Sequence, residues 1–161
     1  MIRTRHLLAV LAWACFAAAA LPVQAQLADK KALTLEAAKK MAAAAEAEAV
    51  KNKWNVVIAI VDDGGHLLYL QRMDGTQTGS IDVAIGKAKT SMAFRRPTKV
   101  FDDLAKTRPS ILTISADAVL LEGGVPIKAG EQVIGAMGVS GVTSQQDAQI
   151  ADAGVAVLTA D

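Results

Sequence analysis

After about residue 30, apolar and polar positions alternate with the periods of helices and strands. From Thr34 to Val50 the apolar residues share one face of a 3.6-residue helix, and charged residues occupy the remaining positions. Thr34 has a side chain suited to an N-cap, and Glu36 stands in the first turn, where the helix dipole favours a carboxylate. This pattern predicts a helix over residues 34–50.

Two strand pairs are predicted next. Residues 55–61 are short, β-branched and nearly all apolar, which is typical of a strand buried on both faces. Asp62-Asp63-Gly64-Gly65 supplies turn residues before 66–72, so residues 55–73 are expected to form a hairpin. A second hairpin is predicted from residues 123–128 and 132–139, with its turn at 129–131.

Helical patterns fill the remaining segments. A helix is expected to open at Ser80 or Asp82, a short one at Pro97 and Thr98, and a last one at Thr143, where Thr143 and Gln146 have the spacing of a capping box. The second helix carries an apolar stripe of Ile81, Ala84, Ile85, Ala88 and Met92, and the last one a buried face of Ile150, Ala151, Gly154, Val157 and Leu158. Hairpins bracketed by helices predict an α+β fold with an antiparallel sheet. The strands are so apolar that helices or a partner subunit should cover both faces of the sheet.

The N-terminus has the layout of a secretory signal. Arg3 and Arg5 precede an apolar run over residues 7–21, and Pro22 to Ala25 supply a helix breaker and a small-residue cleavage pattern. The run is shorter than the roughly 20 residues that span a bilayer. We therefore expect residues 1–25 to be cleaved near Ala25, and residues 26–161 to act as a single periplasmic or secreted domain. The alternative is an uncleaved N-terminal anchor.

Composition narrows the range of functions that the protein could have. With 161 residues, 52% of them hydrophobic, the chain has the size of one domain and is too apolar for disorder. Its 17 basic and 16 acidic residues provide no basic face for nucleic acid. Beyond residue 25 the sequence has no cysteine, which excludes a cysteine nucleophile. It has one histidine there, His66. The sequence therefore predicts no catalytic residue and favours a non-catalytic protein, although an enzyme stays open.

The segment from Gly138 through Ser140 to Gly141 is a candidate anion site. It leads directly to the helix expected at Thr143, whose free backbone N–H groups can bind an anionic oxygen. The alternative is a plain tight turn, for which glycine is also the usual residue. A serine nucleophile is disfavoured, because Val142 stands where the nucleophile elbow has its last glycine.

A second candidate site joins the first hairpin to the helix that follows it. Lys87 lies one position from the stripe residues Ala84 and Ala88, so it is expected at the edge of a buried groove with its ammonium outward. Arg72 either pairs with a nearby Asp or joins Lys87 in a cationic rim for the carboxylates of an apolar ligand. The residues that end the hairpin, and the acid on the next helix, are Arg72, Met73, Asp74 and Asp82.

Five ordered segments resemble one known family, the GlcG/HbpS haem-binding family, which is also similar to the C-terminal domain of PduO-type proteins. The resemblance covers roughly residues 33–159. The segments are Val61-Asp62-Asp63-Gly64-Gly65-His66-Leu67, Arg72-Met73-Asp74-Gly75, Ala84-Ile85-Gly86-Lys87-Ala88-Lys89-Thr90, Gly123-Gly124-Val125-Pro126-Ile127 and Gly135-Ala136-Met137-Gly138-Val139-Ser140-Gly141.

The resemblance implies an α-β-α sandwich with an antiparallel profilin-like sheet, a homo-oligomer, and haem or a related tetrapyrrole as ligand. Some members of the family work beside a redox-sensing signalling partner, and the family has been labelled haem-degrading. These attributes are expectations by analogy, because a fold by itself does not set a function.

Haem needs an apolar slot, a rim for its two carboxylates and, optionally, an axial ligand. We expect the slot on the Ala84 to Met92 face and the rim at Arg72 and Lys87. His66 is the candidate metal ligand, although an exposed and inert imidazole is the alternative. The other possible axial ligands are Met73, Met92, Met137 and Tyr69.

The leading hypothesis is an exported, non-catalytic protein that sequesters or senses haem as a homo-oligomer. One alternative is an enzyme that degrades haem or another small molecule. Another is a structural partner of an extracytoplasmic membrane sensor.

Overall fold

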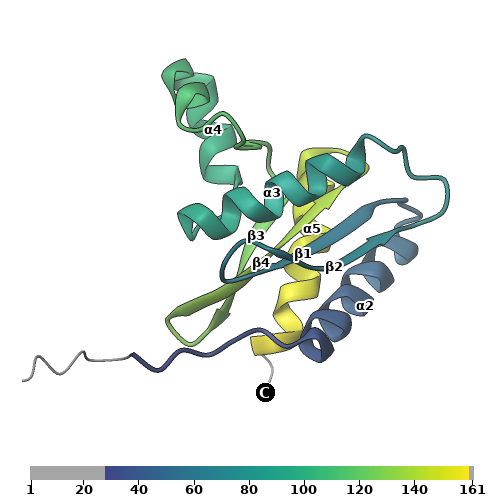
Figure 1. The fold of residues 1–161 in the computed structure, drawn as a ribbon. Coiled ribbons are helices and arrows are strands. Elements are labelled where there is room, and N and C mark those ends of the chain that lie inside the picture. The colour runs from purple at the N-terminus through teal and green to yellow at the C-terminus, as the bar shows by residue number, and fades with distance from the viewer. Residues whose placement is uncertain (1–27, 160–161) are drawn as a thin grey trace, which may run out of the picture. The chain divides into compact units, whose positions relative to one another are not determined.

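A computed structural model describes residues 28–159 of the chain (Figure 1). The signal sequence expected over residues 1–25, with its cleavage near Ala25, lies outside the described residues. From Lys31 onward the chain forms one compact unit. Within the described part, no helix is both long and apolar enough to cross a membrane.

Residues 28–159 contain a four-stranded sheet in the order β2-β1-β4-β3, and every neighbouring pair is antiparallel. Both predicted hairpins are confirmed, and β1 of the first pairs with β4 of the second at the centre of the sheet. The strands are β1 (Val57–Asp62), β2 (Leu67–Arg72), β3 (Gly124–Ala129) and β4 (Gln132–Ser140).

The helices begin where the sequence supplies caps. The Thr34 side chain accepts a hydrogen bond from the Ala37 N–H, and Thr143 and Gln146 form the predicted capping box. The helices are α2 (Leu35–Lys51), α3 (Ser80–Phe94), α4 (Lys99–Thr107) and α5 (Ser144–Val155). Two 3₁₀ turns follow α4 and α5, namely η1 (Pro109–Thr113) and η2 (Ala156–Thr159).

Helices cover both faces of the sheet, as Figure 1 shows: α3 lies on one face, and α2 and α5 lie on the other. The side chains of the central strand β1 divide accordingly, because successive residues of a strand point to opposite faces. Ile58 and Ile60 join the core with α2 and α5, whereas Val57 and Ala59 pack against Ala84 of α3. The predicted α+β fold and its α-β-α layers are therefore confirmed.

Helix α3 lies unusually close to the sheet. A Cβ atom added at Gly138 of β4 would stand 2.1 Å from the Ala84 carbonyl oxygen and 2.6 Å from the Ala88 nitrogen. Glycine on the strand and two alanines on the helix let the two backbones meet directly. No space for a ligand is left between α3 and the sheet at this position.

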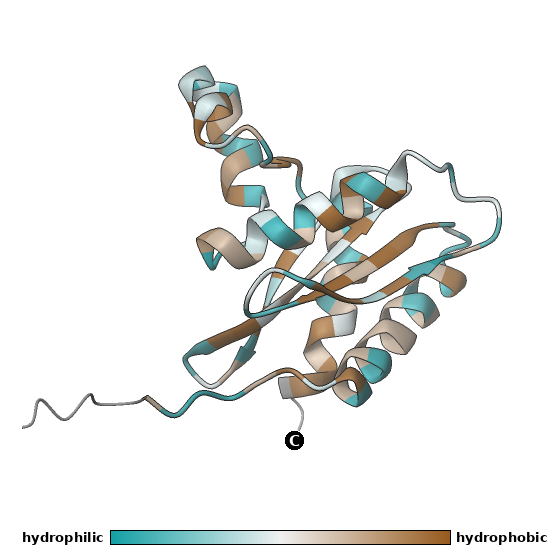
Figure 2. Cartoon of the chain, in the orientation of Figure 1, coloured by the Kyte–Doolittle hydropathy of each residue, from teal (hydrophilic) through white to brown (hydrophobic). Residues whose placement is uncertain are grey.

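A short arm made of α4 and η1 projects from the layered body (Figure 1). Its root is buried, because Phe101 packs edge to face on Phe94 with ring centroids 5.0 Å apart. On the arm itself, Leu112 is 62% exposed and Val100 is exposed as well, and so are Ile114 and Leu121 in the segment that follows η1. In Figure 2 the arm carries brown, hydrophobic stretches between white and teal ones.

One detail of the predicted elements is wrong. The last helix ends at Val155 and tightens into η2, so Val157 is 38% exposed and does not belong to the buried face. Strand β2 lies at the edge of the sheet and leaves Leu67 and Leu70 exposed, so at this edge the predicted alternative of cover by a partner subunit stays a prediction.

Candidate functional site

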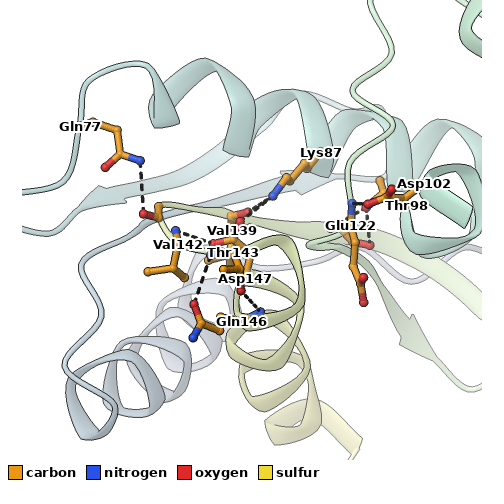
Figure 3. A network of polar contacts seen from close by, with 12 residues as sticks. Gln77, Lys87, Thr98, Asp102, Glu122, Val139, Val142, Thr143, Gln146 and Asp147 are labelled. Atoms are coloured by element: carbon orange, nitrogen blue, oxygen red, sulfur yellow. Dashed lines mark hydrogen bonds and ion pairs between the residues drawn. The ribbon is translucent and has the colours of Figure 1, made fainter. Parts of the chain in front are cut away.

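A buried ion pair links the two faces of the sheet. The Nζ atom of Lys87 in α3 lies 2.8 Å from Oδ2 of Asp147 in α5, and it also donates to the Val139 carbonyl oxygen at 3.0 Å. The two side chains are 1% and 3% exposed. Figure 3 shows Lys87 reaching past the end of β4 toward the first turn of α5.

The second oxygen of Asp147 binds the loop that enters α5. Its Oδ1 accepts the Val142 N–H at 3.2 Å, and the Gly141 N–H donates to the same carboxylate. Burial raises the pKa of Asp147 above its ordinary value, and the contacts with Lys87 and these two N–H groups offset only part of that rise. The carboxyl group thus occupies the place where an external anion would bind this loop.

Neighbouring residues close this polar cluster. Gly123 has φ +123, and a Cβ atom there would stand 2.8 Å from Lys87 Nζ and 2.9 Å from the Asp147 Cβ. Beside it, the Thr98 hydroxyl accepts the Gly124 N–H at 2.8 Å, and Asp102 accepts the Glu122 N–H at 2.9 Å (Figure 3). The segment before β3 is therefore fastened both to the ion pair and to the root of the arm.

These contacts correct the expectation for Lys87. Its ammonium points inward and is bonded to Asp147, so it does not lie at the edge of a groove. Ala84 and Ala88 are fully buried against the sheet, so the expected slot on their face is filled by strands β1 and β4. The physical reason is the short approach at Gly138, which brings the helix within contact of the strands.

The candidate anion site over Gly138 to Gly141 is corrected in the same way. Gly138 and Ser140 are buried within β4, and a Cβ atom at Gly141 would stand 2.4 Å from the Asn55 carbonyl oxygen. The N–H groups that follow are occupied by Asp147 from within the chain. The close approach of neighbouring backbones accounts for Gly138 and Gly141, which neither the anion site nor the alternative of a plain tight turn had predicted.

Residues at the end of the first hairpin lie apart from Lys87. Arg72 and Asp74 are exposed, Met73 packs against the main core, and no ion pair joins Arg72 to Asp74 or Asp82 in residues 28–159. His66 is exposed, and the described residues hold no cluster of three His, Cys, Asp or Glu residues suited to a metal. The structure therefore does not bring Arg72 and Lys87 together in one rim.

The other possible axial ligands are engaged elsewhere. Met137 is fully buried in the main core, and Met92 of α3 is buried in a cluster with Val61 and Ala136 of the sheet. Tyr69 is half-buried and donates its hydroxyl to Gln71 at 2.9 Å.

An open groove of about 540 Å³ lies at the end of the domain where α2 begins. It is lined by Lys31, Lys128, Ala129, Gly130 and Leu158. A smaller depression of about 260 Å³ adjoins it through Leu158 and is lined by Thr34, Glu36, Ala37, Lys40, Met41, Val157 and Leu158. Here apolar and basic side chains share one surface.

Sequence reasoning missed Asp147, although a signal was present. Asp147 precedes Ile150, Ala151 and Gly154 by three, four and seven positions, which places it on the buried face of its helix. The groove had no comparable signal, because Lys31, Lys128 and Leu158 come from three distant parts of the chain.

A family model described as "Haem degrading protein HbpS-like" matches residues 33–156. The chain belongs to the HbpS-like family. Protein GlcG of Escherichia coli K12 is 43% identical over 111 residues, covering 69% of this chain and 83% of GlcG. A 15.0 kDa protein of Citrobacter freundii is 40% identical over 124 residues, covering 74% of this chain and 87% of that protein.

Solved structures share the fold of this HbpS-like chain. HbpS of Streptomyces reticuli, as a double mutant, superposes with a TM-score of 0.76 at 37% identity and covers 87% of this chain and 98% of its own. The PduOC:heme complex superposes with a TM-score of 0.72 at 26% identity and covers 78% and 94%. The predicted membership of the GlcG/HbpS family is thereby confirmed.

Proposed function

We propose that this protein binds haem or a related tetrapyrrole and sequesters or senses it without transforming it. The observation that carries the proposal is the family match over residues 33–156, together with the similarity to a relative that was crystallised with haem. The non-catalytic part is supported by the buried ion pair. Lys87 and Asp147 are bonded to each other and closed off from solvent, so neither side chain is free to act on a ligand.

The described residues suit some parts of haem better than others. The groove at the start of α2 offers aliphatic side chains for an apolar plate and ammonium groups for carboxylates. Met137 and Met92 lie in cores, and His66 is on the surface, so axial ligation is the weaker element of the fit. When bound, haem would supply an iron that changes oxidation state, which is the property a sensor requires.

A hemin titration of the chain over residues 26–161 tests this proposal. We expect a Soret band that shifts and saturates with added hemin. A Soret signal that grows linearly, as for free hemin, would contradict haem binding altogether.

Haem degradation is the second candidate function, and the description of the matching family model favours it. Haem bound to the protein should then lose its chromophore and release iron when a reductant is added, even with catalase present to remove peroxide. Under the leading proposal, chromophore loss with catalase should not exceed that of haem bound to serum albumin.

We also propose that the protein is exported and acts in the periplasm or outside the cell. Arg3 and Arg5, followed by a short apolar run and Ala25, support this location. N-terminal sequencing of the protein from the extracytoplasmic fraction should begin at Gln26. Recovery of a chain that begins at Met1 in the membrane would support the anchored alternative instead.

A partnership with an extracytoplasmic membrane sensor is a further part of the proposal. It is supported only by the family resemblance. Binding of a purified sensor-kinase ectodomain to the haem-free protein would favour a structural role, whereas binding only of the haem-loaded protein would favour sensing.

A further inference from the structure

The groove at the start of α2 is built from three segments that are held in place. Strand β3 contributes Lys128 and Ala129, and η2 contributes Leu158. Lys31 is tied to β4 by a reciprocal pair of bonds, in which its N–H donates to Gln132 Oε1 and its carbonyl oxygen accepts from Gln132 Nε2, both at 3.0 Å. Because Ala129 is the strand partner of Gln132, Lys31 is fixed beside the β3–β4 turn.

The groove carries positive charge that the chain leaves unused. Within residues 28–159, neither Lys31 nor Lys128 lies within ion-pair distance of a carboxylate. Two other exposed lysines are paired: Lys40 with Glu36 at 3.1 Å, and Lys99 with Asp103 at 3.0 Å. Two free ammonium groups across one groove are suited to a ligand with two carboxylates.

Part of the lining of the groove is apolar. Leu158 and Ala129 are partly buried and pack against the main core, so their positions are set by the interior. The adjoining depression extends this surface with Met41 and Val157. The volume of about 540 Å³ falls within the range of about 300–1,000 Å³ that is usual for small-molecule sites.

We infer that this groove binds the carboxylate-bearing edge of a porphyrin, an inference that rests on the proposed function. Lys31 and Lys128 bind the two carboxylates, and Leu158 and Ala129 contact the macrocycle. The lining residues contain no histidine, cysteine or tyrosine. Binding therefore depends on the plate and its carboxylates, and iron is not required.

The test compares two double variants of the chain over residues 26–161 with two ligands. Lys31→Glu/Lys128→Glu reverses both charges of the groove. Lys53→Glu/Lys89→Glu is the matched control, because both lysines are exposed, one just beyond the C-terminal end of α2 and the other on α3. The ligands are hemin, followed by Soret absorbance, and metal-free protoporphyrin IX, followed by fluorescence. Urea unfolding and gel filtration of each variant show that the fold is retained.

We expect wild type to bind protoporphyrin IX within a few-fold of its affinity for hemin. The groove variant should bind both ligands about tenfold more weakly or worse, since two charge-assisted contacts become repulsive. The control variant should stay within about twofold of wild type, because exposed charges far from the ligand contribute little.

Three outcomes would overturn the inference, and they separate it from the proposed function. Equal hemin affinity in wild type and the groove variant rejects the groove while haem binding stands. Binding of hemin without binding of protoporphyrin IX shows that the iron governs affinity, which also rejects the groove. Failure of wild type to bind either ligand rejects the proposed function and, with it, the site.

Discussion

Lys87 and Asp147 show how much one pair of residues can determine in this fold. Taking two charges out of water is costly, and their attraction offsets that cost only when the remaining hydrogen-bonding atoms are also satisfied. Here the Val139 carbonyl oxygen and the Val142 N–H complete the set. The pair therefore sets the position of α3 relative to α5 across the end of β4.

Removing one partner should cost far more than removing both. We expect Lys87→Met or Asp147→Leu alone to lower the free energy of unfolding by about 3–5 kcal/mol, because each leaves an unpaired buried charge. The double variant should lose less than either single variant, and therefore clearly less than the sum of the two single losses. Urea unfolding of the four proteins measures the coupling. Lys99→Met, at an exposed pair, should change the free energy by no more than about 1 kcal/mol. Additive losses would show that the two side chains act independently.

Asp152 on α5 gives a pH-dependent prediction. Burial first, and the negative charge of Glu122 second, raise the pKa of Asp152 above 3.8. The folded state favours the protonated form of this carboxyl group. Its contribution to stability is therefore fully present below about pH 3.8 and is lost as the pH rises through the pKa of the folded state. Asp152→Asn should therefore raise the Tm relative to wild type at pH 7, and the difference should vanish near pH 3. Thermal unfolding followed by circular dichroism over this range tests the sign, and a difference that does not change with pH would refute it.

At the scale of elements, the contact between α3 and β4 decides what the domain can hold. Gly138 lets the two backbones touch, and the expected ligand slot is absent for that reason. The apolar stripe correctly predicted which face of this helix is buried. The sheet covers that face, however, and not the expected ligand. Apolar periodicity shows which face of a helix is buried and does not show what covers it.

Gly138→Ala should be strongly destabilising. A methyl group 2.1 Å from the Ala84 carbonyl oxygen forces α3 away from the sheet, and overpacking of this kind costs about 1–3 kcal/mol or more. Gly79→Ala is the control, because no atom lies within 4 Å of its added Cβ and its φ is −60. Chemical unfolding should show a large loss only for Gly138→Ala. Equal stability of the two variants would mean that α3 moves at no cost.

At the scale of the whole molecule, several large apolar side chains are exposed on the projecting arm and on the segment that follows it. Leu112 lies on the arm, and Ile114 and Leu121 follow it, while the root of the arm is fixed by Thr98 and Asp102. A projection with exposed apolar side chains is suited to contact between copies of the chain. We therefore propose that the arm contributes to a homo-oligomer.

Replacing apolar side chains of this region by negatively charged ones should dissociate that oligomer. Leu112→Glu/Ile114→Glu is expected to reduce the molar mass measured by light scattering after gel filtration. Leu67→Glu/Leu70→Glu places the same charges on the exposed edge strand β2 and should leave the mass unchanged. If only the β2 variant dissociates, the interface lies at the sheet edge and the proposal for the arm is wrong.

The sequence alone determined the features that depend on neighbours along the chain. Thr34 and Thr143 were predicted as caps, because a cap needs only a side chain and the next turn of helix. The strands were predicted from short apolar runs and the turn residues between them, and family membership from five ordered segments. Each cap, run or segment lies within a short stretch of residues.

Only the tertiary structure decided which way Lys87 points and what fills the anion site before α5. A lysine beside an apolar stripe can extend outward or inward, and the outcome depends on whether a carboxylate lies opposite it. Asp147 is 60 residues further along the chain, and only the packing of α3 and α5 on opposite faces of one sheet brings the two together. The groove of Lys31, Lys128 and Leu158 likewise exists only after folding, because long-range contacts depend on the arrangement of the elements and leave no local pattern.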